Sequence, residues 1–139
     1  MLGLMIQEGH ARKFFLAEGE RKTFEVRSKP VKCLEDGDRV ALISVSPQRK
    51  HTIVAILRFE GNVKIPLASF AKFFPLHRVT DKELKDIFGA EITQTHLWGW
   101  HLDVVETFEP GFPLKVKMGP VVWRYFTLED IEDSDSQQD

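Results

Sequence analysis

Residues 18–30 read EGERKTFEVRSKP, a run in which seven side chains carry charge. Within this run, residues 23–27 alternate between polar and apolar side chains, and the polar set is Thr23, Glu25 and Arg27. Side chains on a β-strand point to alternate faces, so this period of two predicts a half-buried strand with one polar face. The ions on that face either form a solvated surface or border a pocket.

The sequence on both sides of this strand predicts further short elements. Upstream, residues 2–6 form an apolar run typical of a strand, and residues 8–18 have helical spacing that ends at Gly19. Downstream, the patterns predict strands at 39–46, 51–59, 96–108, 114–117 and 121–127 and turns at 35–39 and 60–62. They also predict a helix at 66–74 and a capped helix from Thr80 to Gly89. The strand at 96–108 is expected to end at Pro110, Gly111 and Pro113.

These elements amount to six or seven strands and about three short helices, without a repeating strand–helix–strand order. That pattern favours a small, mainly antiparallel α+β barrel over a doubly wound parallel sheet. The length of 139 residues, with 42% hydrophobic and 29% charged residues, is typical of one globular domain. We expect this domain to span residues 1–128.

Charge is unevenly distributed along the chain. Residues 129–139 hold six of the 21 acidic residues, so the rest of the chain has a formal charge of +4. Residues 12–32 alone carry seven basic and three acidic side chains. The acidic end is expected to be a disordered, solvated tail, with competition for a basic nucleic-acid site as the alternative.

The pattern Lys22-x-x-Glu25-x-Arg27, preceded by Gly19, resembles the signature of the ASCH (activating signal cointegrator homology) domain. The family writes this signature Gly-x-Lys-x-x-Glu-x-Arg; the last three residues match in register, but Gly19 lies three residues before Lys22 instead of two. Three further stretches fit the family: GDRVALISV at 37–45, THLWGWHLDVV at 95–105 and GPVVWRYF at 119–126. The resemblance covers about residues 1–128 and implies a PUA-like β-barrel.

Glu25 and Arg27 share a strand face, and Lys22 is expected at the turn before the strand, pointing over the same space. A cleft with two cations and one carboxylate suits a nucleotide. Lys22 and Arg27 would bind a phosphate, and Glu25 would accept protons from the amino group of a base. The alternative is a surface ion pair that contributes about 0–1 kcal/mol. Arg21 and Lys29 would add attraction for the nucleic-acid backbone.

Two tryptophans share one face of the strand predicted at 96–108. Trp98 and Trp100 either pack in the core or stack against bases, an interaction worth about 1–3 kcal/mol per base. Gly99 falls on the opposite face, where the missing side chain would let a ligand or another strand approach closely.

The resemblance implies binding of RNA or a modified nucleotide, and it leaves an enzyme as the alternative. Some small ASCH-like proteins are amidohydrolases on N4-acylated cytidine, with a lysine, a threonine and a glutamate as their catalytic set. Here Lys22 is kept, but Glu25 stands at the threonine position and His77 at the glutamate position. We therefore favour binding over catalysis; Lys22 and His77 are the residues that acid–base chemistry, including ribonuclease activity, would use.

Several classes of protein do not fit the sequence. Cys33 is the single cysteine, which excludes an intrachain disulfide and zinc-finger spacing, and the five histidines form no metal-binding motif, so we expect no metal and no cofactor. No run of 18 apolar residues and no secretory signal is found, so we expect a cytoplasmic or nuclear protein without a membrane partner.

Overall fold

The computed structural model describes residues 1–17, 19–89, 93–115 and 122–132. The chain forms two compact units, and each is built from separate stretches of sequence. The first unit contains Met1–Arg12, Arg39–Arg58 and the residues from Val104 onward, and the second contains Lys13–Asp38 and Phe59–Asp103. Neither unit is therefore a continuous segment, and the expected single domain over 1–128 remains a prediction.

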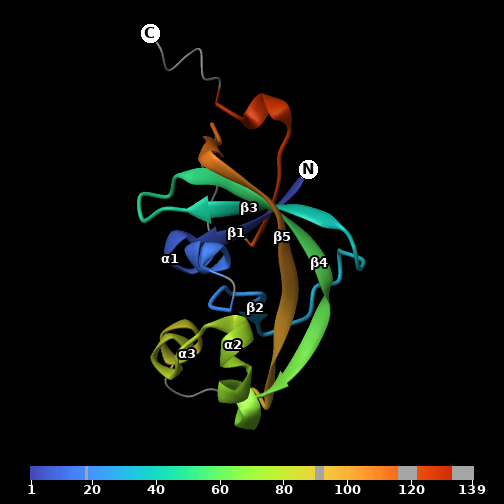
Figure 1. The fold of residues 1–139 in the computed structure, drawn as a ribbon, viewed down its shortest axis with the longest axis vertical. Helices are drawn as coiled ribbons and strands as arrows, with labels where there is room; N and C mark the ends of the chain where they lie inside the picture. The colour runs from blue at the N-terminus through green and yellow to red at the C-terminus, as the bar shows by residue number, and fades with distance from the viewer. Residues whose placement is uncertain (18, 90–92, 116–121, 133–139) are drawn as a thin grey trace. The chain divides into compact units, whose positions relative to one another are not determined.

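Six strands form one sheet in the order β2-β5-β4-β3-β1-β6 (Figure 1). β1 pairs in parallel with β3, whereas the β1–β6, β2–β5 and β3–β4 pairs are antiparallel. This confirms the mainly antiparallel sheet. The strands are β1 (Leu2–Gln7), β2 (Phe24–Arg27), β3 (Arg39–Val45), β4 (His51–Pro66), β5 (His96–Pro113) and β6 (Trp123–Tyr125).

Three short α-helices accompany the sheet in the described part of the chain, as expected: α1 (Glu8–Ala11), α2 (Phe74–His77) and α3 (Asp81–Phe88). Three 3-10 turns, η1 (Arg12–Phe15), η2 (Leu67–Phe73) and η3 (Leu128–Asp130), complete the described elements. The predicted cap of α3 is confirmed, because Thr80 Oγ1 accepts from the backbone N–H of Glu83 and Glu83 Oε1 accepts from that of Thr80, each at 3.1 Å.

The first unit has a hydrophobic core of its own. β1 lies between β3 and β6, so its side chains pack against neighbours on both sides. The core of this unit comprises Met5, Ala41, Ile43, Ile53, Leu114 and Phe126.

The second unit packs the apolar face of β2 against α3 and the η2 segment. Its core comprises Phe24, Val26, Ile65, Phe70, Val79, Leu84 and Leu97. A Cβ atom on Gly99 would lie 2.5 Å from Cδ2 of Phe24. Gly99 is therefore explained by the Phe24 ring that lies over it, and not by a ligand.

Both long strands extend beyond their predicted ends. The turn expected at 60–62 is wrong, because β4 continues through these residues. The side-chain amide of Asn62 accepts from the backbone N–H of Val31 at 2.9 Å and donates to the Val31 carbonyl at 3.0 Å. The break expected at Pro110 to Pro113 is also wrong: a Cβ on Gly111 would lie 2.6 Å from the Ile53 carbonyl, so glycine lets β5 continue against β4.

The helix predicted at 8–18 is shorter than expected. After α1 the chain tightens into η1, and the carbonyl of Lys13, which a continuing helix would use for the N–H of Ala17, accepts instead from the N–H of Lys22 at 2.8 Å. This hydrogen bond ends the helix and starts the approach to β2.

The described chain stays hydrogen-bonded beyond residue 128, where the acidic tail was expected to start. Glu129 and Asp130 lie in η3, Ile131 forms a bridge with Leu114, and the N–H of Glu132 donates to the Pro113 carbonyl at 2.8 Å. The disordered tail expected over residues 129–139 remains a prediction. In the strand predicted at 114–117, Leu114 forms an isolated bridge and is not part of a longer strand among the described residues. Residues 116–117, 121 and 133–139 lie outside the described residues.

Candidate functional site

The polar face of β2 and the tryptophan face of β5 are the same face of the sheet. In the antiparallel register Glu25 lies opposite Trp100, and Arg27 lies opposite Trp98. Residues directly opposite in adjacent strands point to the same side. Four of the seven residues predicted for the site therefore come together on this face, while the apolar side chains of β2 point into the core.

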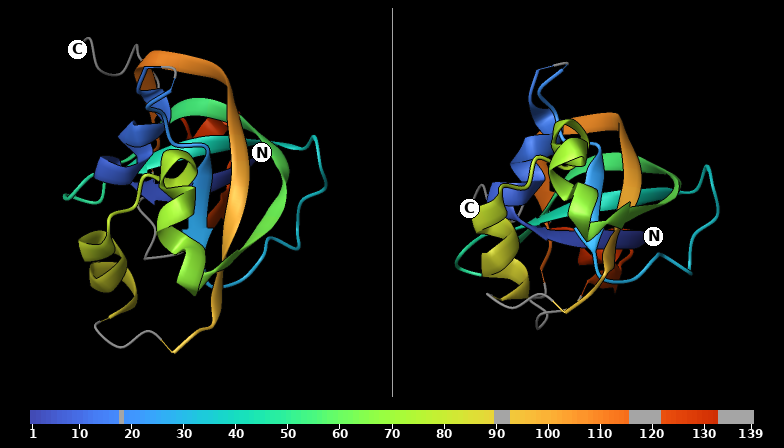
Figure 2. Two further views of the ribbon diagram at one scale, coloured as in Figure 1. Left: turned by 60° about the horizontal axis from the view of Figure 1, so that its bottom comes forward. Right: turned by 90° about the horizontal axis from the view of Figure 1, so that it is seen from below.

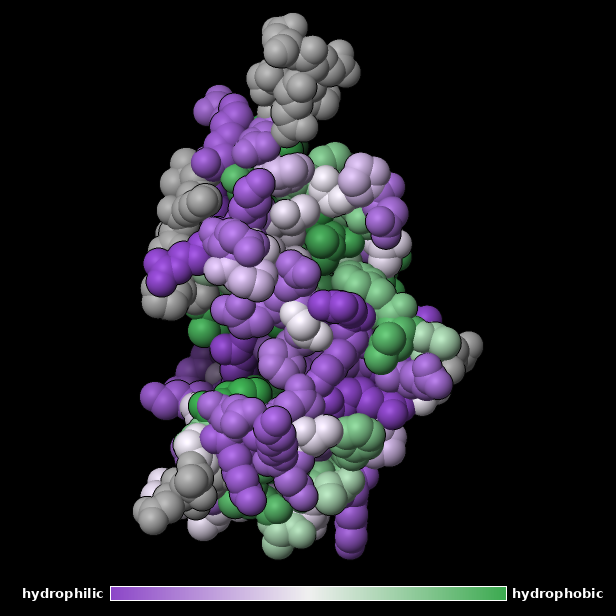
Figure 3. Space-filling view, turned by 90° about the vertical axis from the view of Figure 1, so that its left-hand side faces the viewer, coloured by the Kyte–Doolittle hydropathy of each residue, from purple (hydrophilic) through white to green (hydrophobic). Residues whose placement is uncertain are grey.

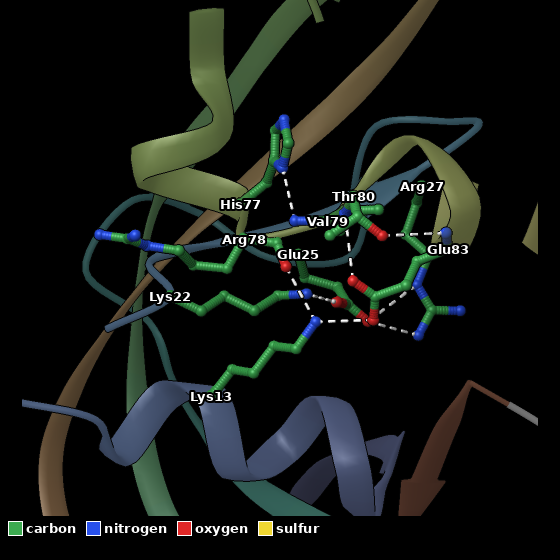
Figure 4. A network of polar contacts seen from close by, with 9 residues as sticks. All are labelled: Lys13, Lys22, Glu25, Arg27, His77, Arg78, Val79, Thr80 and Glu83. Carbon is green, nitrogen blue, oxygen red and sulfur yellow. Dashed lines mark hydrogen bonds and ion pairs between the residues drawn. The ribbon is translucent and has the colours of Figure 1, made fainter. Parts of the chain in front are cut away.

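Glu25 is held between two cations. Its Oε1 lies 3.0 Å from Nζ of Lys22, and its Oε2 accepts from Nη2 of Arg27 at 2.8 Å and from Nε at 3.2 Å. The dashed lines in Figure 4 trace these contacts. Both carboxylate oxygens are thus engaged, and the cluster carries a net formal charge of +1.

Burial separates the three members of this cluster. Lys22 is 1% exposed and Glu25 6% exposed, whereas the side chain of Arg27 keeps 29% of its surface in solvent. Burial alone would raise the pKa of Glu25, but the charges of Lys22 and Arg27 and their hydrogen bonds lower it below the ordinary value. Glu25 is therefore an ionised anchor, and Arg27 is the member that solvent reaches.

The Arg27 guanidinium lies over the ring of Trp100, which is itself held in place. Its Cζ lies 5.4 Å from the ring centroid of Trp100, within the range of a cation–π interaction. Trp100 is itself fixed, since its indole N–H donates to the backbone carbonyl of Lys29 at 2.8 Å. Trp98 is half-buried and meets His96 edge to face, with centroids 5.8 Å apart.

The backbone that carries Lys22 is held from two sides. The N–H of Lys22 donates to the carbonyl of Lys13, and the N–H of Thr23 donates to the carbonyl of Leu76 in α2, each at 2.8 Å. Both views in Figure 2 show α2 beside β2. The ammonium of Lys22 also lies 5.8 Å from the ring centroid of Phe14.

A second ion pair supports this arrangement, and the sequence analysis missed it. Nζ of Lys13 lies 2.8 Å from Oε2 of Glu83 and donates to the carbonyl of Arg78, also at 2.8 Å. Burial opposes ionisation of Glu83, but the hydrogen bonds from Lys13 and Thr80 lower its pKa to about 2. The Thr80-x-x-Glu83 capping pattern was visible in the sequence, whereas its link to Lys13 was not.

His77 is fully buried, and both of its ring nitrogens are engaged. Nδ1 accepts from the N–H of Val79 at 2.9 Å, so the ring proton sits on Nε2, which lies 2.9 Å from the Phe70 carbonyl. Burial lowers the pKa of His77, and the charges of Lys22 and Lys13 lower it further against the opposing Phe70 hydrogen bond. Acid–base chemistry at His77 would therefore require one of these bonds to break.

The other predicted contact residues lie outside the ion cluster. Arg21 and Lys29 are exposed, and neither side chain takes part in an ion pair among the described residues. Thr23 has a buried hydroxyl without a hydrogen-bond partner in the described part of the chain.

Across residues 1–17, 19–89, 93–115 and 122–132, no group of three or more His, Cys, Asp or Glu side chains could hold a metal ion. Within these same ranges no helix has the length and apolar character needed to cross a membrane.

Comparison with known proteins identifies the class of fold. Crystal structures of ASCH from Zymomonas mobilis match at 11% identity: one has a TM-score of 0.63 and covers 93% of this chain and 89% of its own. Two mutant forms match with TM-scores of 0.63 and 0.61, each covering 99% of this chain and 94% and 92% of their own. This chain therefore has an ASCH-type fold, with a mainly antiparallel sheet and short helices.

Comparisons of sequence found no relative of this chain. No protein-family model matches the chain. A search of curated proteins likewise found no significant match.

Proposed function

We propose that the protein binds RNA or a nucleotide on the β2–β5 face that carries Arg27. The observation that supports this most strongly is the Arg27 guanidinium, which a buried carboxylate holds over Trp100 while 29% of its side chain stays exposed. An arginine fixed in this way loses little conformational entropy when it meets a phosphate.

Charge around the site favours an anionic ligand. The Lys22–Glu25–Arg27 cluster has an excess of one positive charge, and the exposed side chains of Arg21 and Lys29 belong to the same unit. Hydrophilic side chains predominate on the face drawn in Figure 3, where hydrophobic ones form small separate patches. The excess positive charge of the cluster suits an anionic ligand better than an apolar one.

The ASCH-type fold supports the same proposal by analogy. The fold resemblance implies a role in RNA metabolism, but a fold alone does not define a function. The local chemistry therefore carries the argument.

A fluorescence anisotropy titration with a short labelled RNA tests the proposal. We expect saturable binding whose affinity falls as salt rises from about 50 mM to about 200 mM. Arg27→Ala should weaken binding about tenfold and reduce the dependence on salt by about one phosphate contact.

Arg12→Ala is the matched control, because it also removes one positive charge. The Arg12 side chain is 69% exposed and belongs to the first unit. Its replacement should leave RNA affinity within about twofold. Equal losses for the two variants would contradict the proposed site.

A further inference from the structure

The hydrogen-bonding capacity of Glu25 is directed inward. Its two oxygens accept from Lys22 and Arg27, and its side chain is only 8% exposed. A carboxylate that reads the amino group of a base must offer an oxygen to the ligand. Glu25 therefore suits the task of holding Arg27 better than the task of contacting a base.

Arg27 offers its remaining donors outward. Its Nε and Nη2 are bonded to Glu25, and one face of the guanidinium covers Trp100. Nη1 has no partner among the described residues. An arginine edge of this kind binds a phosphate oxygen irrespective of the neighbouring base.

Trp98 provides an aromatic surface next to that donor. It lies directly opposite Arg27 in the β2–β5 register and is half-buried, and it meets the His96 ring edge to face. Trp100, in contrast, is buried under Arg27. Of the two predicted stacking residues, Trp98 is therefore the one that a base can reach.

We infer that the site recognises the face of a base and its phosphate, and not the base edge. This inference rests on the proposed function. Trp98 stacks on the base and Arg27 binds the phosphate, while Glu25 keeps the guanidinium in place. Every base has a π-face, so this mode tolerates any base. It requires single strands, because bases within a duplex are already stacked on each other.

The test compares RNA oligomers of uridine, cytidine and adenosine of equal length with the full chain. We expect affinities within about fivefold of one another, and binding to a duplex at least about tenfold weaker. Trp98→Ala should weaken binding to all three oligomers about tenfold or more, by a similar factor for each. Trp98→Phe keeps an aromatic face and should stay within about threefold of the unmodified protein.

Glu25→Gln separates the two roles of the carboxylate. Uracil has no exocyclic amino group, whereas cytosine and adenine each have one. If Glu25 only holds Arg27, the variant weakens binding to the three oligomers by one common factor. This ratio is measured on a single protein sample, so a partial loss of folded protein does not alter it.

Three results would overturn the inference and leave the proposed function intact. These are a preference above about twentyfold for one oligomer, unchanged affinity in Trp98→Ala, or a selective loss of cytidine and adenosine binding in Glu25→Gln. Failure of the unmodified protein to bind the oligomers or the free mononucleotides of the same bases would instead overturn the proposed function itself.

Discussion

The second unit contains two lysine–glutamate pairs of similar geometry but different burial. The nitrogen–oxygen distance is 3.0 Å in the Lys22–Glu25 pair and 2.8 Å in the Lys13–Glu83 pair. In the first pair the side chains are 2% and 8% exposed, and in the second they are 21% and 30% exposed. Their similar distances suggest equal contributions to stability, but the difference in burial means that losing one partner should cost more stability in the first pair.

In the buried Lys22–Glu25 pair, each charge depends on the other for compensation. Removing one partner from a buried pair leaves the other as an uncompensated charge in a medium of low polarity. A pair that water reaches pays no such penalty, because the remaining charge is simply solvated. Breaking the Lys22–Glu25 pair is therefore expected to destabilise the protein more than breaking the Lys13–Glu83 pair, which joins Lys13 to α3.

The largest expected effect comes from Glu25→Ala. This change leaves Lys22 buried without its carboxylate and should lower the free energy of unfolding by about 3–5 kcal/mol. Chemical denaturation measures the loss. Glu20→Ala, which removes an exposed glutamate, is the control and should change stability by less than about 0.5 kcal/mol. A loss below about 1 kcal/mol in Glu25→Ala would show that the two pairs do not differ as proposed.

A smaller effect is expected for the exposed pair. A double-mutant cycle with Lys13→Ala and Glu83→Ala should give a coupling energy of about 0.5–1 kcal/mol at low salt. About 1 M salt shortens the screening length to about 3 Å, so the coupling should then diminish. Coupling that persists in high salt would mean that the pair is shielded from solvent and resembles Lys22–Glu25.

The third expected effect is a change of stability in acid. The folded-state pKa of Glu83, about 2, lies below its ordinary value of 4.5, so its contribution to stability is present above pH 4.5 and is lost as the pH falls toward 2. Subtracting the unfolding free energy of Glu83→Gln from that of the unmodified protein isolates this contribution at each pH. The difference should shrink across this window, and a constant difference would contradict it.

Local patterns in the sequence were enough to predict the strand at the centre of the site. The alternation over residues 23–27 placed Glu25 and Arg27 on one face, and β2 has this arrangement. The capped helix before Gly89 was also predictable, because its signals lie within a few residues of each other. Such features depend on neighbours in sequence, which a single chain reveals.

What the sequence could not reveal depends on contacts between distant residues. β4 continues past residue 60 because Asn62 is paired with Val31, and β5 continues past Pro110 because Gly111 fits against Ile53. The Lys13–Glu83 pair joins residues 70 positions apart. None of these partners can be inferred from periodicity or turn propensity.

The way the two units share the chain has a practical consequence for dissecting the protein. The backbone passes between the units at residues 12–13, 38–39, 58–59 and 103–104, and two of these crossings fall inside the long strands β4 and β5. No single cleavage can therefore release either unit with its strands whole. A truncation at either of these boundaries would interrupt the hydrogen bonding of β4 or β5. The role of each residue is therefore better tested by point substitution in the full chain.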